Sequence, residues 1–147
     1  MTSEFSIAVH ALAVLNYRRG TVSSERLAKS ICTHPARVRR VMARLSKCGL
    51  VETREGADGG YLFLRDPETV TLQQIGDAVE ACYVRTAWRS GDTNMDCLIA
   101  SGMADVMDGI YDELNALCRE RLAHCTLAEV GRRLFLAHGT CAQTSTQ

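Results

Sequence analysis

The sequence has no hydrophobic run long enough to cross a membrane and no segment that resembles a secretory signal. The longest apolar stretch near the N-terminus, residues 7–15, is interrupted by His10, and no basic residue precedes it. A signal peptide begins with a positively charged region, so this stretch does not fit one. We therefore expect a cytoplasmic protein without a membrane-bound segment.

The sequence also has no closely spaced pair of cysteines, although it contains seven of them. Zinc and iron–sulfur sites usually show such pairs, with two residues between the ligands. Without an export signal, the seven cysteines indicate reduced thiols and not a disulfide framework. We expect no metal ligands and no cofactor, and an iron–sulfur cluster would require two chains to pool their cysteines.

The sequence also has no net charge, because 17 basic residues balance 17 acidic ones. The two signs are nevertheless separated along the chain. Residues 1–66 contain eleven Lys and Arg against six Asp and Glu, and residues 67–147 contain six against eleven. This asymmetry is modest, but it fits a DNA-facing first half joined to a second half that does not touch DNA.

The basic charge is concentrated in a predicted helix over residues 34–48. Pro35 suits the first turn of a helix, and Gly49 suits the position after its end. Steps of three and four residues place four cations on one side, at Arg37, Arg40, Arg44 and Lys47. Apolar residues form a second stripe facing a core. Arginine near the start of such a helix is well placed for guanine readout, so Arg37 is the first candidate, with Arg39 reaching a phosphate.

The segments around this helix predict a winged helix-turn-helix. A short helix capped by Ser23 covers residues 24–30, and a tight turn at residues 32–33 leads into the basic helix. Residues 50–54 and 61–64 then read as two strands joined by a glycine-rich turn. A nucleotide phosphate loop would lead into a helix, so this turn belongs to a β-hairpin wing.

The second half predicts a long helix for dimerisation. A capping box at residues 71–74 first opens a helix to about residue 82. Residues 89–94 then form a polar linker, and a helix covers about residues 96–125. Apolar residues at heptad spacing form a seam on it: Met103, Met107, Ile110, Leu114 and Leu117. A last helix opens at a capping box at residues 126–129 and runs to about residue 137. We therefore expect a mainly α fold with three parts: a winged helix-turn-helix domain at 1–88, a linker and dimerisation region at 89–138, and a disordered tail at 139–147.

Four sequence segments together resemble a known family. They are ALAVL at residues 11–15, SSERLAKS at 23–30, VRRVMARLSKCGLVETREG at 38–56 and GGYLFLRDPETVTLQQIGDAVE at 59–80. Residues 3 to about 80 resemble the Rrf-two family of bacterial winged helix-turn-helix transcriptional regulators. The resemblance implies a homodimer on a dyad-symmetric operator in double-stranded DNA, with the basic helix in the major groove and the wing near the minor groove. On the wing it points to Arg54, Gly59, Gly60 and Tyr61.

Two departures from the family pattern concern the wing and the sensor. Several relatives place an arginine directly before the glycine of the wing, where this chain has Glu55, with Arg54 one position earlier. Iron–sulfur members of the family carry three closely spaced cysteines before the long helix, whereas this chain has only Cys82 and Cys97 there, with fourteen residues between them. Cys97 lies near a predicted helix start, which lowers a thiol pKa, and is the first candidate for a sensor. The alternative is that both thiols are structural.

Taken together, the sequence predicts a DNA-binding transcriptional regulator and not an enzyme. We expect a homodimeric repressor that responds to redox or thiol stress or to a small ligand. Two alternatives from other classes stay open: a thiol-dependent or metal-handling protein, and a winged-helix interaction module that does not bind DNA. The first alternative would need a histidine coupled to a cysteine, and no sequence feature pairs His34, His124 or His138 with one.

Overall fold

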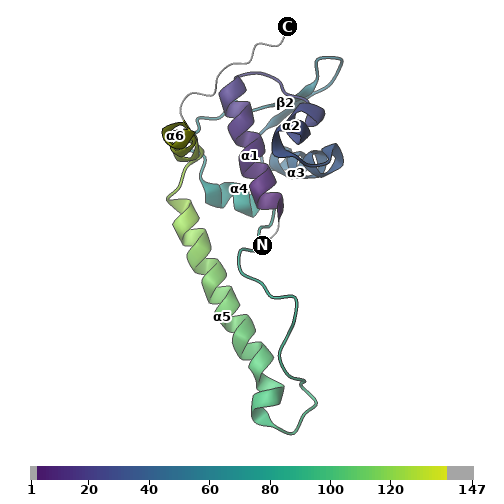
Figure 1. Ribbon diagram of the computed structural model, residues 1–147, viewed down its shortest axis with the longest axis vertical. Coiled ribbons are helices and arrows are strands. Elements are labelled where there is room, and N and C mark those ends of the chain that lie inside the picture. Colours follow the sequence, from purple (N-terminus) through teal and green to yellow (C-terminus); the bar gives the residue numbers. More distant parts are fainter. Residues whose placement is uncertain (1–2, 139–147) are drawn as a thin grey trace.

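A computed structural model of the protein describes residues 3–138, and within them the chain forms six helices and one β-hairpin (Figure 1). The mainly α fold with a small wing is thus confirmed. None of the helices in residues 3–138 is long and apolar enough to span a membrane. The helices are α1 (Ser3–Arg18), α2 (Ser24–Ile31), α3 (Pro35–Lys47), α4 (Leu72–Ala78), α5 (Leu98–Ala123) and α6 (Leu127–His138), and the strands are β1 (Glu52–Arg54) and β2 (Gly60–Leu62).

Helix α1 is the central element of the compact part of the molecule. It contacts α2 and α3 on one side and α6 on the other, and α4 also packs against it (Figure 1). Its apolar residues recur at helical spacing, so Ala8, Leu12 and Leu15 are all buried. From α3, Val38, Met42 and further apolar residues complete the same core. The winged domain therefore has α1 at its centre.

The helix-turn-helix has the Ser23 cap that the sequence predicts and a second cap, at His34, that it did not. Ser23 caps α2 by accepting a hydrogen bond from the backbone N–H of Arg26. His34 caps α3 through Nδ1, which accepts a hydrogen bond of 3.2 Å from the backbone N–H of Ala36. Gly49 follows α3 with φ +70°, a conformation that glycine adopts without strain.

The wing is tied directly to the connection between α1 and α2. Val22 pairs with Tyr61 through two backbone hydrogen bonds of 3.0 and 2.9 Å. At Gly60 the backbone passes so close to this segment that a Cβ atom would lie 2.4 Å from the carbonyl oxygen of Val22. Only glycine fits there, so this contact sets the position of the wing. The strands are shorter than the predicted 50–54 and 61–64.

Helix α4 begins as predicted but ends earlier. The capping box of Thr71 and Gln74 is present. The sequence indicated a helix to about residue 82, but the helix ends at Ala78. Glu80 adopts a left-handed conformation with φ +53°, and the N–H of Ala81 bonds back to the carbonyl of Gly76. This turn redirects the chain into the linker, and a glutamate gives no sequence signal for it.

Helix α5 projects away from the winged domain, and the linker of residues 79–97 runs beside it (Figure 1). Helix α6 then returns to the domain. Backbone hydrogen bonds join Leu72 to Cys125 and Leu127 to Val70, and Cys125 and Leu127 are buried in the same core as α1. Thus α6 packs with the winged domain, whereas the domain division expected from sequence grouped it with the dimerisation helix.

Candidate nucleic-acid interface

The outward face of α3 is the candidate surface for DNA. At about 3.6 residues per turn, the residues opposite the buried stripe of this helix are Ala36, Arg40, Ala43 and Lys47. All four are exposed. The predicted cationic stripe is therefore shifted around the helix, with two of its cations at the centre of the face and two at its edge. The two alanines were missed, because small residues give no charge signal.

Arg40 and Lys47 are the central cations of this face. Arg40 lies 3.2 Å from Glu4, and its side chain is 61% exposed whereas that of Glu4 is 19% exposed, so the guanidinium group remains accessible to another anion. Lys47 forms no ion pair among the residues that the structure describes. Lys47 can therefore reach a phosphate or a base edge directly, and Arg40 can do so by exchanging its contact with Glu4.

Arg37 and Arg44 lie at the edge of the face, beside α1. Arg44 donates a hydrogen bond of 2.9 Å to the carbonyl oxygen of Val79 at the end of α4 and lies 3.3 Å from Glu4. Arg37 donates hydrogen bonds to the hydroxyl groups of Ser3 and Thr33. The side chains of Arg37 and Arg44 therefore connect α3 to neighbouring segments, and that of Arg37 remains exposed.

Arg39 lies at the opposite edge, beside α2. Its guanidinium group is 3.1 Å from the carboxylate of Glu25 and 3.2 Å from the hydroxyl of Ser24. The pKa of Glu25 is lowered, first by a hydrogen bond from its own backbone N–H, then by Ser24, with Arg39 as a further cause. Arg39 therefore joins the two helices of the helix-turn-helix and remains half-exposed beside the outward face.

The wing carries one exposed cation, Arg54, on β1 opposite Gly60. Arg54 has no ion pair within residues 3–138. At Gly59 a Cβ atom would lie 2.6 Å from the carbonyl oxygen of Arg54, so the glycine permits a tight turn. Tyr61 is half-buried, and burial raises the pKa of its phenol group. In the free protein, Gly59, Gly60 and Tyr61 therefore shape the wing that presents Arg54.

The two candidate sensor thiols have different surroundings. Cys97 is exposed at the N-cap of α5, where the backbone N–H groups of Ala100 and then Ile99 lower the pKa of its thiol. Cys82 is half-buried, with its Sγ 3.5 Å from the carbonyl oxygen of Val84 and 3.9 Å from the side chain of Asn115. Of the two, Cys97 is the more accessible to oxidants.

Cys82 and Cys97 do not meet within one chain. Asn115, which contacts Cys82, lies eighteen residues after Cys97, and a helix rises about 1.5 Å per residue. Roughly 27 Å of α5 therefore separates the two thiols. Across residues 3–138, no three His, Cys, Asp or Glu side chains are grouped so that they could hold a metal ion. Within one chain, Cys82 and Cys97 are therefore too far apart to hold one metal centre together or to form a disulfide with each other.

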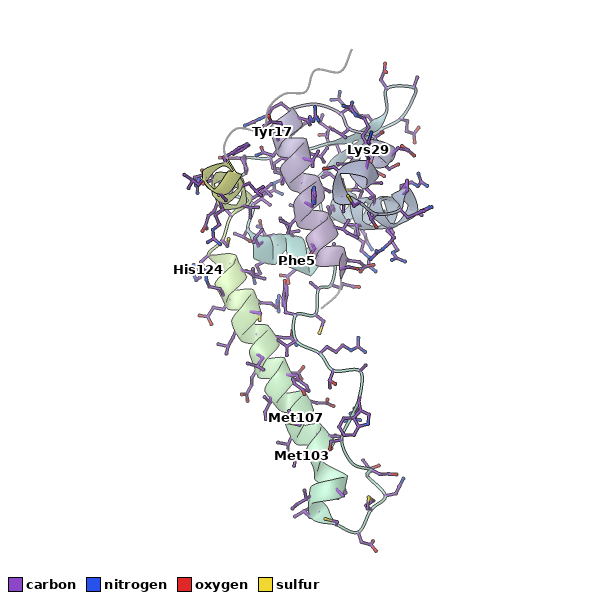
Figure 2. All side chains as sticks on the ribbon, viewed as in Figure 1. Phe5, Tyr17, Lys29, Met103, Met107 and His124 are labelled. Atoms are coloured by element: carbon purple, nitrogen blue, oxygen red, sulfur yellow. The ribbon has the colours of Figure 1, made fainter. Side chains whose placement is uncertain are left out.

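The predicted seam on α5 is exposed along most of its length. Met103, Ile110, Leu114 and Leu117 are exposed, whereas Met107 is half-buried. Val106, which the heptad pattern missed, is 59% exposed and lies beside Ile110 on the same face. Figure 2 shows this helix standing clear of the winged domain with Met103 and Met107 near its far end. The described part of the chain leaves the seam uncovered.

The family follows from comparison with known proteins. The model of the Rrf2 family, described as "Iron-dependent Transcriptional regulator", matches residues 1–133. The chain belongs to the Rrf2 family. It is thus a DNA-binding transcriptional regulator, and the family resemblance seen in the sequence is confirmed. A curated relative, the "Putative HTH-type transcriptional regulator YwnA" of Bacillus subtilis (strain 168), is 27% identical over 135 residues, which are 92% of this chain and 99% of YwnA.

Solved structures share this fold. A "putative transcriptional regulator" from Lactobacillus plantarum is 24% identical, with a TM-score of 0.78 over 94% of this chain and 92% of that one. IscR of T. potens is 20% identical, with a TM-score of 0.69 over 96% and 92% of the two chains. CymR, the global cysteine regulator of B. subtilis, is 19% identical, with a TM-score of 0.62 over 90% and 96%. The winged domain and the projecting α5 therefore form an architecture that other regulators share.

Proposed function

We propose that this protein is a homodimeric repressor whose two α3 helices enter successive major grooves of a dyad-symmetric operator. The observation that carries the proposal is the outward face of α3, where two exposed cations alternate with two exposed alanines. Membership in a family of transcriptional regulators supports it, and for the same reason we infer that the chain is not an enzyme.

The composition of this face suggests how a groove would be read. Arg40 can donate two hydrogen bonds to guanine, and Lys47 can neutralise a phosphate. Ala36 and Ala43 allow the helix to approach closely, and their methyl groups can contact the methyl group of thymine. Arg54 extends from the wing towards the neighbouring minor groove. Arg40 would exchange Glu4 for a phosphate, since the Arg40 side chain is exposed and Glu4 keeps Arg44 as a second partner.

Dimerisation would proceed through α5. The exposed apolar seam runs along a helix that stands away from its own domain, so a second copy can cover it by isologous packing. Such a dimer would hold its two recognition helices about one DNA turn apart, roughly 34 Å. Dimerisation and operator binding would then both depend on α5, because this helix sets the distance between the two α3 helices.

For the signal, we propose oxidation of the Cys97 thiol. The thiol is exposed, and the backbone N–H groups of α5 favour its thiolate form, which is the form that reacts with oxidants. Cys97 lies at the far end of α5, so a modification there would alter the dimer helix and with it the spacing of the recognition helices. The same-fold protein CymR is described as a cysteine regulator, which is compatible with a thiol-based signal here.

Binding to DNA from upstream of the protein's own gene tests the proposal. In fluorescence anisotropy, we expect the log of the parent's affinity to fall linearly with log salt, by about 0.9 per phosphate neutralised. The Arg40→Ala variant should bind at least tenfold more weakly. Arg65→Ala removes the same charge from an exposed site outside α3 and is the matched control. If the Arg40→Ala variant binds like the parent, α3 is not the recognition helix.

A further inference from the structure

A cavity of about 690 Å³ lies between α1, α2 and α6, away from the outward face of α3. Its inner wall is apolar, with Val14, Val22 and Leu127 among its lining residues. Tyr17, labelled near the end of α1 in Figure 2, and Phe135 of α6 stack at one side with their ring centroids 5.7 Å apart. This volume and lining are typical of a small-molecule site.

The same cavity is bordered by three arginines: Arg18, Arg19 and Arg26. No acidic residue lines it, and none of the three arginines forms an ion pair within residues 3–138. This sets them apart from Arg39, Arg40 and Arg44, each of which has a carboxylate partner. His10 and Ser30 supply further polar groups, 3.1 Å apart. The cavity thus combines an apolar interior with unneutralised positive charge.

We propose that this cavity binds a small amphipathic carboxylate, an aromatic or medium-chain carboxylic acid. The apolar part of such a molecule would occupy the space between Val14, Leu127 and Phe135, where its burial is favourable. The carboxylate would meet the guanidinium groups, which bind carboxylates through paired charge-assisted hydrogen bonds. A neutral or cationic molecule of the same shape lacks that second interaction.

The position of the cavity connects it to DNA binding. Arg26 and Ser30 belong to α2, which packs on α3 and fixes its position in the helix-turn-helix. A bound carboxylate neutralises positive charge on the winged domain and fills the space between α2 and α6. Both effects lower affinity for DNA. This regulatory part rests on the proposed function, whereas binding of the carboxylate to the free protein does not.

Calorimetric titration of the full-length protein with octanoate and with 3-phenylpropanoate tests the site. We expect saturable binding of one molecule per chain, and binding of octan-1-ol that is at least tenfold weaker. Arg18→Gln should weaken octanoate binding about tenfold, and Arg65→Gln, with the same charge change outside the cavity, should leave it unchanged. Equal affinity for octanoate and octan-1-ol, or equal effects of the two variants, would overturn the proposal.

A second variant fills the cavity without disturbing the backbone. A Cβ atom at Gly131 would have no neighbour within 4 Å, so the Gly131→Leu variant places a side chain in open space along the lining of the cavity. Gly131→Ala brings a comparable gain in helix propensity with only one methyl group and is the control. Octanoate should bind the Gly131→Ala variant and not the Gly131→Leu variant. Undiminished binding to the Gly131→Leu variant would place the ligand elsewhere.

A third arm measures DNA affinity. Saturating octanoate should weaken binding of the upstream DNA about tenfold for the parent and should not affect the Gly131→Leu variant. Octanoate that binds without changing DNA affinity would overturn the regulatory part. Absence of DNA binding by the unliganded parent would refute the proposed function and leave the carboxylate site intact. If octanoate binds a chain that ends at residue 138 but not the full-length protein, the cavity would be assigned to the protein's own last residues. That result would overturn the proposed site.

Discussion

Arg40 and Arg44 stand one helical turn apart on α3 and share Glu4 as a partner, yet their surroundings differ. Arg44 also donates to the carbonyl of Val79, where α4 ends and the linker begins, and its side chain is the less exposed of the two. Arg40 has only the carboxylate of Glu4 as a partner, and its own side chain is 61% exposed. We infer that Arg44 serves mainly to hold α3 against α1 and α4, and that Arg40 is available to bind DNA.

The Arg44→Ala variant should therefore be less stable, because the carbonyl of Val79 and the carboxylate of Glu4 both lose a charged donor. We expect a loss of about 1 kcal/mol, at the lower end for such hydrogen bonds because the group is partly exposed. Urea unfolding followed by circular dichroism measures it. The Arg40→Ala variant is the comparison and should unfold close to the parent, and equal losses for the two variants would show that their roles do not differ.

The thiol of Cys97 gives a second prediction at this scale. The N–H groups of Ala100 and Ile99 lower its pKa in the folded protein, and unfolding removes them. In a variant whose other cysteines are serine, alkylation by iodoacetamide should therefore reach half of its maximal rate at a lower pH in buffer than in urea. Coincident pH profiles would show that the start of α5 does not activate this thiol.

Some of these residue roles follow from sequence and others cannot. The cap at Ser23 and the glycine after α3 depend on neighbours within a few residues, so local rules are sufficient. The partners of Arg44 lie 40 and 35 residues away along the chain, and no periodicity within α3 indicates them. Charge alone therefore overestimated how much of the cationic stripe faces outward.

At the scale of elements, the side chain of Asn115 joins α5 to the linker. Asn115 accepts hydrogen bonds of 2.8 and 2.9 Å from the N–H groups of Tyr83 and Val84 and donates one of 2.8 Å to the carbonyl of Val84. The heptad pattern of α5 does not indicate this residue, because its partners belong to an irregular segment. Arg119 and Asp77 add a two-pronged ion pair between α5 and α4.

The Asn115→Ala variant should release the linker from α5. Three partly buried backbone groups would lose their partner, at a cost of about 1–3 kcal/mol in local stability. Hydrogen exchange is the measurement, and amides 83 and 84 should exchange at least tenfold faster while amides in the middle of α1 are unchanged. Asn94→Ala, in an exposed part of the same linker, is the control. Unchanged exchange at residues 83 and 84 would show that other contacts hold the segment.

The seam of α5 gives the second prediction for an element. The Ile110→Glu, Leu114→Glu double variant places four carboxylates in the proposed dimer interface, where burial of unpaired charge is costly. We expect monomers in sedimentation velocity at concentrations where the parent is a dimer. Asp112→Asn changes an exposed carboxylate on the opposite side of the helix and should leave the dimer intact. A stable dimer of the double glutamate variant would locate the contact on another surface.

For the whole molecule, the order of elements and the winged helix-turn-helix followed from sequence, because each has a local pattern of period, cap or turn. The return of α6 to the first domain did not. It depends on backbone pairing of residues 70–72 with residues 125–127 and on burial of Leu127, contacts that are more than fifty residues apart. As a consequence, a cavity lies between α1, α2 and α6, and no sequence motif indicates it.

In the proposed complex, two copies of the chain place two α3 helices on one face of DNA. Hydroxyl-radical footprinting of the parent dimer on DNA from upstream of its gene tests it most directly. We expect two protected patches related by a dyad and separated by about one helical turn, roughly 34 Å, both lost in the Arg40→Ala variant. A single protected patch, or two patches that persist in the Arg40→Ala variant, would contradict it.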